Sequence, residues 1–275
     1  MSAGIDTWRR NGVTFAAFDP GRLGVWTAGV QDQNQVTPSG PFDAIRGSGA
    51  SMVLNGPEFG VCAGQNLPSD QVSQYAQSAC DSIRFAQYDA SRGLWLPGVS
   101  PDDSRSIMIS VVGGNATATP GNSERPDGAS AAVQLMPTLV VAEQPIANNG
   151  NVSGGSQIVW RAALGILRDG RLVFAAGQHD ISGFVSALIS NGVANAGYTD
   201  GGGSTSLVFD SGDRYGHPEQ RRVATWLTVG QPNVLATIIP ASPAGRAIAA
   251  ALLVGAAAAG YVWWKSRPKT GGRSR

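Results

Sequence analysis

The feature that most constrains this chain is a run of three glycines at positions 201–203, set between two apolar segments. Glycine loses more backbone freedom on folding than any other residue. Three in a row therefore indicate a sharp turn or the close approach of a ligand to the backbone. Asp200 precedes the run, and Ser204 and Thr205 follow it. Successive backbone N–H groups facing one concavity bind anions, so the run is either an anion site or a hairpin turn that begins with an aspartate.

The rest of the chain is typical of strands joined by turns. Its 275 residues include 37 glycines and 16 prolines, and the apolar runs are short and often β-branched, which argues against a helical bundle. Polar, glycine-rich segments at 31–49 and 113–130 are expected to be loops. The predicted strands are 13–18, 23–30, 51–54, 105–112, 131–142, 158–167, 172–176, 194–199, 204–209, 222–229 and 234–239.

Two segments have helical periodicity. In 69–88, apolar residues recur at steps of three and four, and Ser182 can cap a short helix over 183–190. The predicted fold class is α+β: a strand-rich mixed sheet core with a few short helices, followed by a single hydrophobic helix at the C-terminus.

That last helix is predicted from an uncharged stretch of 18 residues, Ala247–Trp264, which is followed by Lys265 and further basic residues. At 1.5 Å per residue it covers roughly 27 Å, close to the ~30 Å hydrocarbon core of a bilayer. We expect a domain over 1–240, then a linker, a transmembrane helix and a basic tail over 241–275. The alternative is an alanine-rich helix that packs on the domain or on a partner protein.

The charges bear on partners and location. Residues 1–243 carry 14 Arg and 19 acids, a net charge of −5, so no basic stripe for nucleic acid is expected. The basic tail favours a membrane anchor with the domain outside the cytoplasm or within a virus particle, although the N-terminus lacks the apolar core of a signal peptide. Cys62 and Cys80 have no metal-ligand spacing; they are either a disulfide pair or two thiols, and no metal or cofactor is expected.

Several motifs in combination resemble the phosphodiester glycosidase family. The family has a D-G-G-G-S-[ST] loop, which matches 200–205, and an R-[TA]-A-[IL]-G strand, which matches 161–165 and starts 39 residues before Asp200. Its R-x-V-[AT] strand resembles 221–224. Its early N-G-G-[FY]-F turn falls at 55–59, where Pro57 and Glu58 depart from the pattern.

The resemblance implies a hydrolase that cleaves the glycosidic bond of a sugar-1-phosphodiester, similar to a GlcNAc-1-phosphodiester, in a surface or envelope glycan. Such a site must hold an anion and stabilise an oxocarbenium-like sugar. The expected catalytic residues are Asp200, Arg161 and His179. The expected substrate-binding residues are Asn55, Gly201, Gly202, Gly203, Ser204, Thr205 and Arg222.

Each of these residues also has a structural alternative. Asp200 can cap the loop's own amides, Arg161 can pair with a buried carboxylate, and Asn55 can stabilise its turn. Glu58 is a further possible proton-transfer group. Because Pro57 and Gln178 stand where the family has other residues, the alternative function is a non-catalytic, glycan-binding or structural component of an envelope or virus particle.

Overall fold

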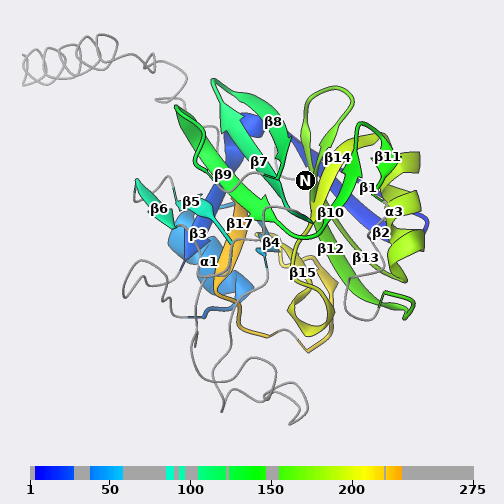
Figure 1. The fold of residues 1–275 in the computed structure, drawn as a ribbon. Helices are drawn as coiled ribbons and strands as arrows, with labels where there is room; N and C mark the ends of the chain where they lie inside the picture. Colours follow the sequence, from blue (N-terminus) through cyan, green and yellow to red (C-terminus); the bar gives the residue numbers. More distant parts are fainter. Residues whose placement is uncertain are drawn as a thin grey trace, which may run out of the picture. The chain divides into compact units, whose positions relative to one another are not determined.

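The structure, a computed structural model, describes residues 4–27, 38–57, 85–89, 93–96, 105–121, 124–146, 155–219 and 221–230 (Figure 1). All of them belong to the unit Met1–Pro232. In this part of the chain the strands form three sheets, and two short helices accompany them. The expectation of a strand-rich core with a few short helices is therefore confirmed.

The first sheet contains the predicted strands 158–167 and 172–176, which form an antiparallel hairpin, and the strands on either side of it. Arg161 pairs with Gly177 across that hairpin, and Ala163 pairs with Tyr198 on the other side. The spatial order of the strands is β1 (Ile5–Arg10), β2 (Val13–Phe18), β13 (Leu172–His179), β12 (Val159–Leu167), β14 (Val193–Tyr198), β10 (Thr138–Val141) and β11 (Gln144–Pro145).

Two smaller sheets complete the strand arrangement. The second sheet has the order β16 (Arg214–Gly216), β15 (Ser206–Phe209), β4 (Met52–Asn55), β17 (Thr225–Val229) and β3 (Leu23–Thr27). The third has the order β6 (Leu94–Leu96), β5 (Gln87–Asp89), β9 (Ala129–Leu135), β7 (Ile107–Val112) and β8 (Asn115–Pro120). Since β14 lies in the first sheet and β15 in the second, the glycine run crosses from one sheet to the other.

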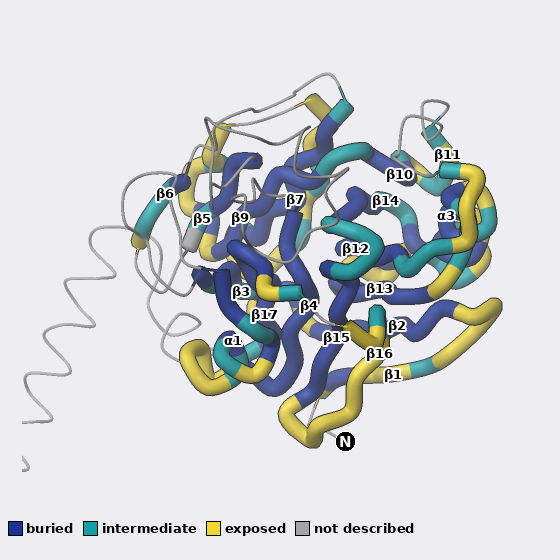
Figure 2. Tube along the Cα trace, turned by 90° about the horizontal axis from the view of Figure 1, so that it is seen from below, coloured by how far each residue is buried: buried dark blue, intermediate teal, exposed yellow. Residues whose placement is uncertain are grey.

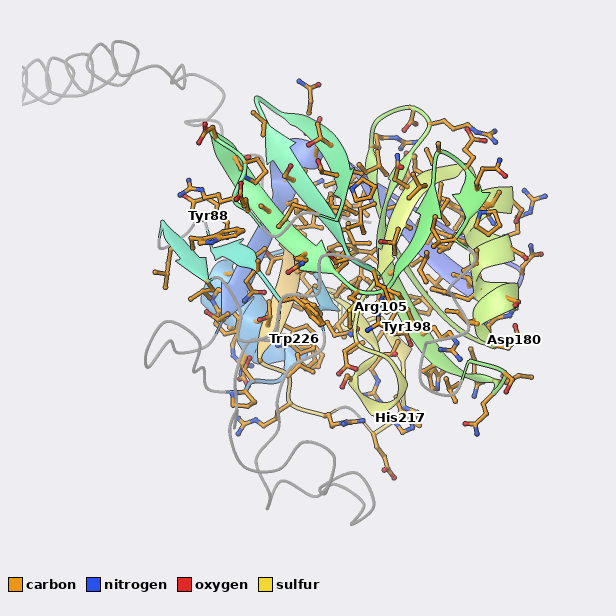
Figure 3. The ribbon with its side chains drawn as sticks, in the orientation of Figure 1. Tyr88, Arg105, Asp180, Tyr198, His217 and Trp226 are labelled. Atoms are coloured by element: carbon orange, nitrogen blue, oxygen red, sulfur yellow. The ribbon has the colours of Figure 1, made fainter. Side chains whose placement is uncertain are left out.

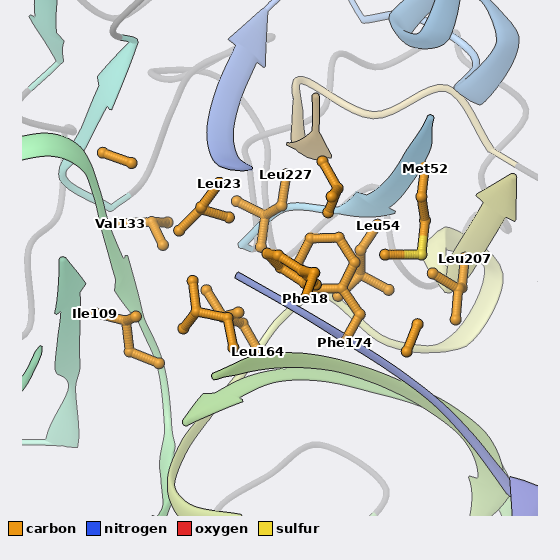
Figure 4. Packing of buried hydrophobic residues seen from close by; sticks show 14 of the residues in the cluster. Phe18, Leu23, Met52, Leu54, Ile109, Val133, Leu164, Phe174, Leu207 and Leu227 are labelled. Atoms are coloured by element: carbon orange, nitrogen blue, oxygen red, sulfur yellow. The ribbon is translucent and has the colours of Figure 1, made fainter. Parts of the chain in front are cut away.

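A shared apolar core holds the three sheets together. It takes Leu164 and Phe174 from the first sheet, Leu54 from the second and Ile109 from the third (Figure 4). Phe18 and Phe174 meet edge to face, with ring centroids 4.8 Å apart. Strand β15, which follows the glycine run, contributes Leu207 and Phe209 to this core, and β14, which precedes the run, contributes Val193 and Ala196 to a second apolar cluster. Figure 2 shows these strands mostly in dark blue, as buried.

Both helices have recognisable boundary signals. Helix α1 (Pro41–Ser48) starts with a proline in its first turn and ends at Gly49, whose φ is 68°. It lies in the segment 31–49, so the prediction of a loop there was wrong for 41–48. Helix α3 (Ile181–Ser190) is capped by Asp180, which accepts from the Gly183 N–H, and not by Ser182.

Three strands also differ from expectation. The predicted loop 113–130 contains β8, a half-exposed edge strand that pairs with β7 across a Gly113–Gly114 turn. Strand β1 was not predicted. The predicted helix 69–88 is wrong at its end, where β5 begins at Gln87, and 69–84 lie outside the described residues.

The predicted membrane segment Ala247–Trp264 also lies outside the described residues. Among the residues that are described, neither helix is long and apolar enough to cross a bilayer. The linker and tail predicted over 241–275 therefore remain predictions.

Candidate functional site

The glycine loop, Thr199–Thr205, begins where β14 ends and leads into β15. Its backbone is tied to strand β4, because the Asp200 N–H donates to the Gly56 carbonyl at 3.0 Å. A short 3₁₀ turn, η4 (Gly202–Ser204), follows, and Gly202 has a φ of 58°. A side chain at position 202 would be strained in this left-handed conformation, which explains why glycine stands there.

Asn55, the last residue of β4, holds this loop in place through hydrogen bonds of its side chain. Its side chain is fully buried. Its Nδ2 donates to the Asp200 carbonyl at 2.6 Å, and its Oδ1 accepts from the Ser206 N–H at 3.0 Å. Asn55 therefore bridges the start and the end of the loop, and both ends of its amide contact the chain's own backbone.

Two amides of the loop remain unused. The Gly201 N–H donates to the Asp200 carboxylate, with a distance of 2.9 Å to Oδ1. Within the described part of the chain, the N–H groups of Gly202 and Gly203 have no hydrogen-bond partner, and both residues are partly exposed. Unused donors of this kind are what an anion requires.

A guanidinium group lies directly beside these amides, but it belongs to Arg221 and not to Arg222. A Cβ at Gly203 would lie 3.1 Å from Arg221 Nε and 3.2 Å from Nη2, and the Arg221 N–H donates to the Gly203 carbonyl at 3.1 Å. Arg221 is half-buried and forms no ion pair among the described residues. Arg222 is exposed and faces Asp43, with 3.8 Å between Nη2 and Oδ2, so the structure does not bring it to the loop.

Arg161 is fully buried, and its guanidinium forms several hydrogen bonds. Its Nε donates to the His179 carbonyl at 2.9 Å and its Nη2 to the Gln157 carbonyl at 3.1 Å. Its Nη1 lies 3.3 Å from the Tyr198 hydroxyl oxygen. That hydroxyl in turn lies so close to Gly201 that a Cβ there would overlap it. The Tyr198 hydroxyl therefore lies next to both Arg161 and Gly201 of the loop.

His179 is not brought to the loop by its side chain. Its Nε2 lies 2.5 Å from the Asn11 carbonyl oxygen in the β1–β2 turn, so this nitrogen carries the proton and donates it. Only its backbone carbonyl contacts Arg161. Figure 3 shows the next residue, Asp180, at the outer end of α3 and well apart from Tyr198.

Buried hydroxyls follow the glycines. Among the described residues, four buried side-chain oxygens have no hydrogen-bond partner: Ser204 Oγ, Thr205 Oγ1, Ser206 Oγ and Gln87 Oε1. Gln87 also belongs to this region, because its Nε2 donates to Thr225 Oγ1 at 2.9 Å and the Thr225 carbonyl accepts from the Gly56 N–H. Buried polar atoms without partners are rare in proteins, so their concentration around one loop sets this region apart.

Sequence reasoning missed three residues of this region: Arg221, Tyr198 and Gln87. A signal for Arg221 was present, since the pattern R-x-V-[AT] has its arginine at the first position. Of the other expected groups, Glu58, Cys62 and Cys80 lie outside the described residues. The described residues contain no group of three His, Cys, Asp or Glu side chains that could hold a metal ion.

The comparisons with known proteins give one family match. The family model "Phosphodiester glycosidase" matches residues 86–230, just over half of the chain. No curated protein sequence matches the chain.

Two solved structures have a similar fold. One is the zebrafish N-acetylglucosamine-1-phosphodiester alpha-N-acetylglucosaminidase catalytic domain, auto-inhibited by its pro-peptide. It is 14% identical with a TM-score of 0.55, and the match covers 82% of this chain and 81% of that one. The other is a Burkholderia pseudomallei protein described as exported, 13% identical with a TM-score of 0.50, with 80% and 74% covered. At these identities the likeness shows the fold alone, whereas the match to the family model shows membership: this chain belongs to the phosphodiester glycosidase family.

Proposed function

We propose that this protein hydrolyses the glycosidic bond of a sugar-1-phosphodiester, with the phosphate held at the glycine loop. The observation that carries the proposal is the Arg221 guanidinium beside Gly203, next to the unused N–H groups of Gly202 and Gly203. Two amides and one guanidinium offer charge-assisted hydrogen bonds to one phosphate group. The name of the zebrafish enzyme suggests N-acetylglucosamine as the sugar.

In this proposal the phosphate leaving group determines which kind of catalytic help the reaction needs. A water oxygen bonds to C1 of the sugar while the bond from C1 to the phosphate oxygen breaks, and the phosphomonoester departs with the electron pair. Because phosphate is a stable leaving anion, donors that stabilise its charge contribute more than a strong general acid does. Arg221 and the two amides supply that stabilisation.

Asp200 is the proposed base. The residue is partly exposed, and its carboxylate accepts a hydrogen bond from the Gly201 N–H of the loop. It takes the proton from the attacking water or stabilises the positive charge that develops on the sugar.

The remaining expected residues receive other roles. We assign positioning of the loop to Asn55 and to the pair Arg161–Tyr198, since their side chains contact the chain's own groups. Ser204 and Thr205 supply hydroxyls at the end of the loop. His179 receives no proton-transfer role because its imidazole donates to Asn11.

We further propose that the protein acts outside the cytoplasm on a surface or envelope glycan. The description of the Burkholderia pseudomallei protein as exported supports this location. The segment 247–264 remains the predicted anchor.

The test is turnover of a synthetic N-acetylglucosamine-1-phosphodiester by the full chain, measured as release of phosphomonoester. Asp200→Asn should abolish release, and Arg222→Ala should leave it unchanged because Arg222 faces Asp43. Glycan binding with no turnover would overturn the proposal in favour of a binding protein. If Asp200→Asn released phosphomonoester as fast as the parent chain, Asp200 would not be the base.

A further inference from the structure

A cavity lies away from the glycine loop, between the edge strand β1 of the first sheet and the edge strand β16 of the second. Figure 2 shows these two strands next to each other. The cavity has a volume of about 410 Å³ and is open to solvent on one side. We call it the edge cleft; its lining residues are Ile5, Thr7, Phe209, Asp210, Ser211, Asp213 and Tyr215.

The edge cleft is separate from the glycine loop although one strand connects them. Ser206 begins β15 at the loop, and Phe209 ends it at the cleft. Three residue steps of a strand span roughly 10 Å. A ligand in the cleft therefore contacts residues that the proposed hydrolysis does not use.

Aromatic rings form the apolar part of the cleft. Tyr215 is 37% exposed, which makes it one of the few large apolar side chains that the described surface presents to solvent. Its ring meets the buried Phe209 ring edge to face, at 6.2 Å between centroids and 87° between planes. The Phe209 ring thus packs against the Tyr215 ring, and a ligand that stacks on a ring already packed on one side loses less side-chain entropy on binding.

The polar part of the cleft consists of carboxylates and hydroxyls. Ionised Asp210 and Asp213 can only accept hydrogen bonds. The Phe209 N–H donates to the Asp213 carbonyl, and the Ser211 hydroxyl donates to Asp213 Oδ2 at 2.9 Å. The β15–β16 turn therefore fixes the Asp213 carboxylate next to the aromatic pair.

We infer that the edge cleft binds a neutral pyranose sugar. A pyranose has an apolar C–H face that suits the Tyr215 ring and several hydroxyl donors that suit carboxylate acceptors. A cleft that is apolar on one side and acceptor-rich on the other matches both properties in one ligand. The cleft would retain a glycan on the protein whether or not the glycine loop hydrolyses it.

Binding of chitotriose and of maltotriose to the full chain tests this inference, measured by saturation-transfer NMR and by titration. At least one trisaccharide should bind saturably, and Tyr215→Ala and Asp213→Asn should each weaken that binding about tenfold, a change of about 1.4 kcal/mol. Phe42→Ala removes a comparably exposed aromatic ring outside the cleft, on α1, and should change nothing. Asp200→Asn should also leave the binding intact, which separates this site from the proposed hydrolysis.

Two results would overturn the inference. One is that neither sugar binds, or that binding is the same in Tyr215→Ala and Asp213→Asn as in the parent chain. The other is that the polycation spermidine binds at the cleft in place of sugars and that added salt releases it. Salt screens the attraction between a cation and the carboxylates but does not weaken the binding of a neutral sugar. Circular dichroism and the thermal midpoint show whether both variants fold, so that lost binding is not mistaken for unfolding.

Discussion

At the scale of single residues, Gly203 and Arg221 lie so close together that a Cβ at 203 would come within 3.1 Å of the guanidinium. The adjacent Arg222 points to Asp43 instead. From the sequence we expected Arg222 at the loop, whereas the structure places Arg221 beside Gly203.

Arg221→Ala should lower kcat/KM for a sugar-1-phosphodiester about a hundredfold, the usual cost of removing one donor that stabilises a developing anion. Arg221→Lys should recover part of the loss, since it keeps the charge and loses the planar fork. Arg222→Ala is the matched control with no expected effect. Equal losses for Arg221→Ala and Arg222→Ala would contradict the assignment.

Gly201 and Tyr198 form a second close pair. Gly201→Ala should cost about 1–3 kcal/mol of unfolding free energy, because the new methyl overlaps the Tyr198 hydroxyl. Tyr198→Phe removes that hydroxyl and with it the overlap. The double variant should therefore lose about 1 kcal/mol less unfolding free energy than the two single variants lose in sum. Urea unfolding of the four proteins measures this coupling, and strictly additive losses would refute the contact.

At the scale of elements, the end of β4 and the start of β15 are held at a fixed distance by Asn55. Asn55→Ala leaves the buried Ser206 N–H and Asp200 carbonyl without this partner and should cost about 3 kcal/mol in urea unfolding. Asn115→Ala, in the exposed β8, is the control. A loss at position 55 no larger than at position 115 would mean that the side chain does not hold the loop.

The turns β10–β11 and β12–β13 are joined by Glu143 and Arg168. A hydrogen bond from Arg168 lowers the pKa of Glu143 below its usual 4.5. Because the pKa is lower in the folded state, this contribution to stability is present above the unfolded pKa and is lost as pH falls through the folded pKa. NMR titration should therefore give Glu143 a depressed pKa, and the stability difference between the parent and Glu143→Gln should shrink below about pH 4. A titration at or above the usual value would show that the pair does not form in solution.

Elements whose apolar pattern is strong could be predicted from the sequence, as β12, β13 and β14 were. Those that depend on tertiary packing could not. Strand β8 alternates alanine and threonine and is too polar for a hydrophobic signal, although the Gly113–Gly114 turn before it was a usable hairpin signal. Helix α1 was hidden in a polar segment, with only Pro41 and Gly49 to mark its ends.

At the scale of the whole molecule, the candidate site was partly predictable. The sequence predicted a turn or a close approach of a ligand at the glycine run after Asp200, because glycine loses the most backbone freedom on folding. The structure shows a turn there, between β14 and β15. Whether His179 presents its imidazole or its carbonyl to Arg161 depends on the orientation of a strand end, which a lone sequence does not encode. The same holds for Asn55, whose amide faces the loop only because β4 and β15 are neighbours in the second sheet.

The three-sheet arrangement explains why the loop can carry a site. Strands β14 and β15 belong to different sheets that share one core, so the loop between them is fixed at both ends while its middle amides stay unused. A rigid frame with unpaired donors is the condition for preorganised anion binding.

The most direct test of this account is a crystal structure of Asp200→Asn with a bound sugar-1-phosphate. The account predicts phosphate oxygens about 3 Å from the N–H nitrogens of Gly202 and Gly203 and from the Arg221 guanidinium. Phosphate bound elsewhere, with both amides and Arg221 left uncontacted, would contradict it.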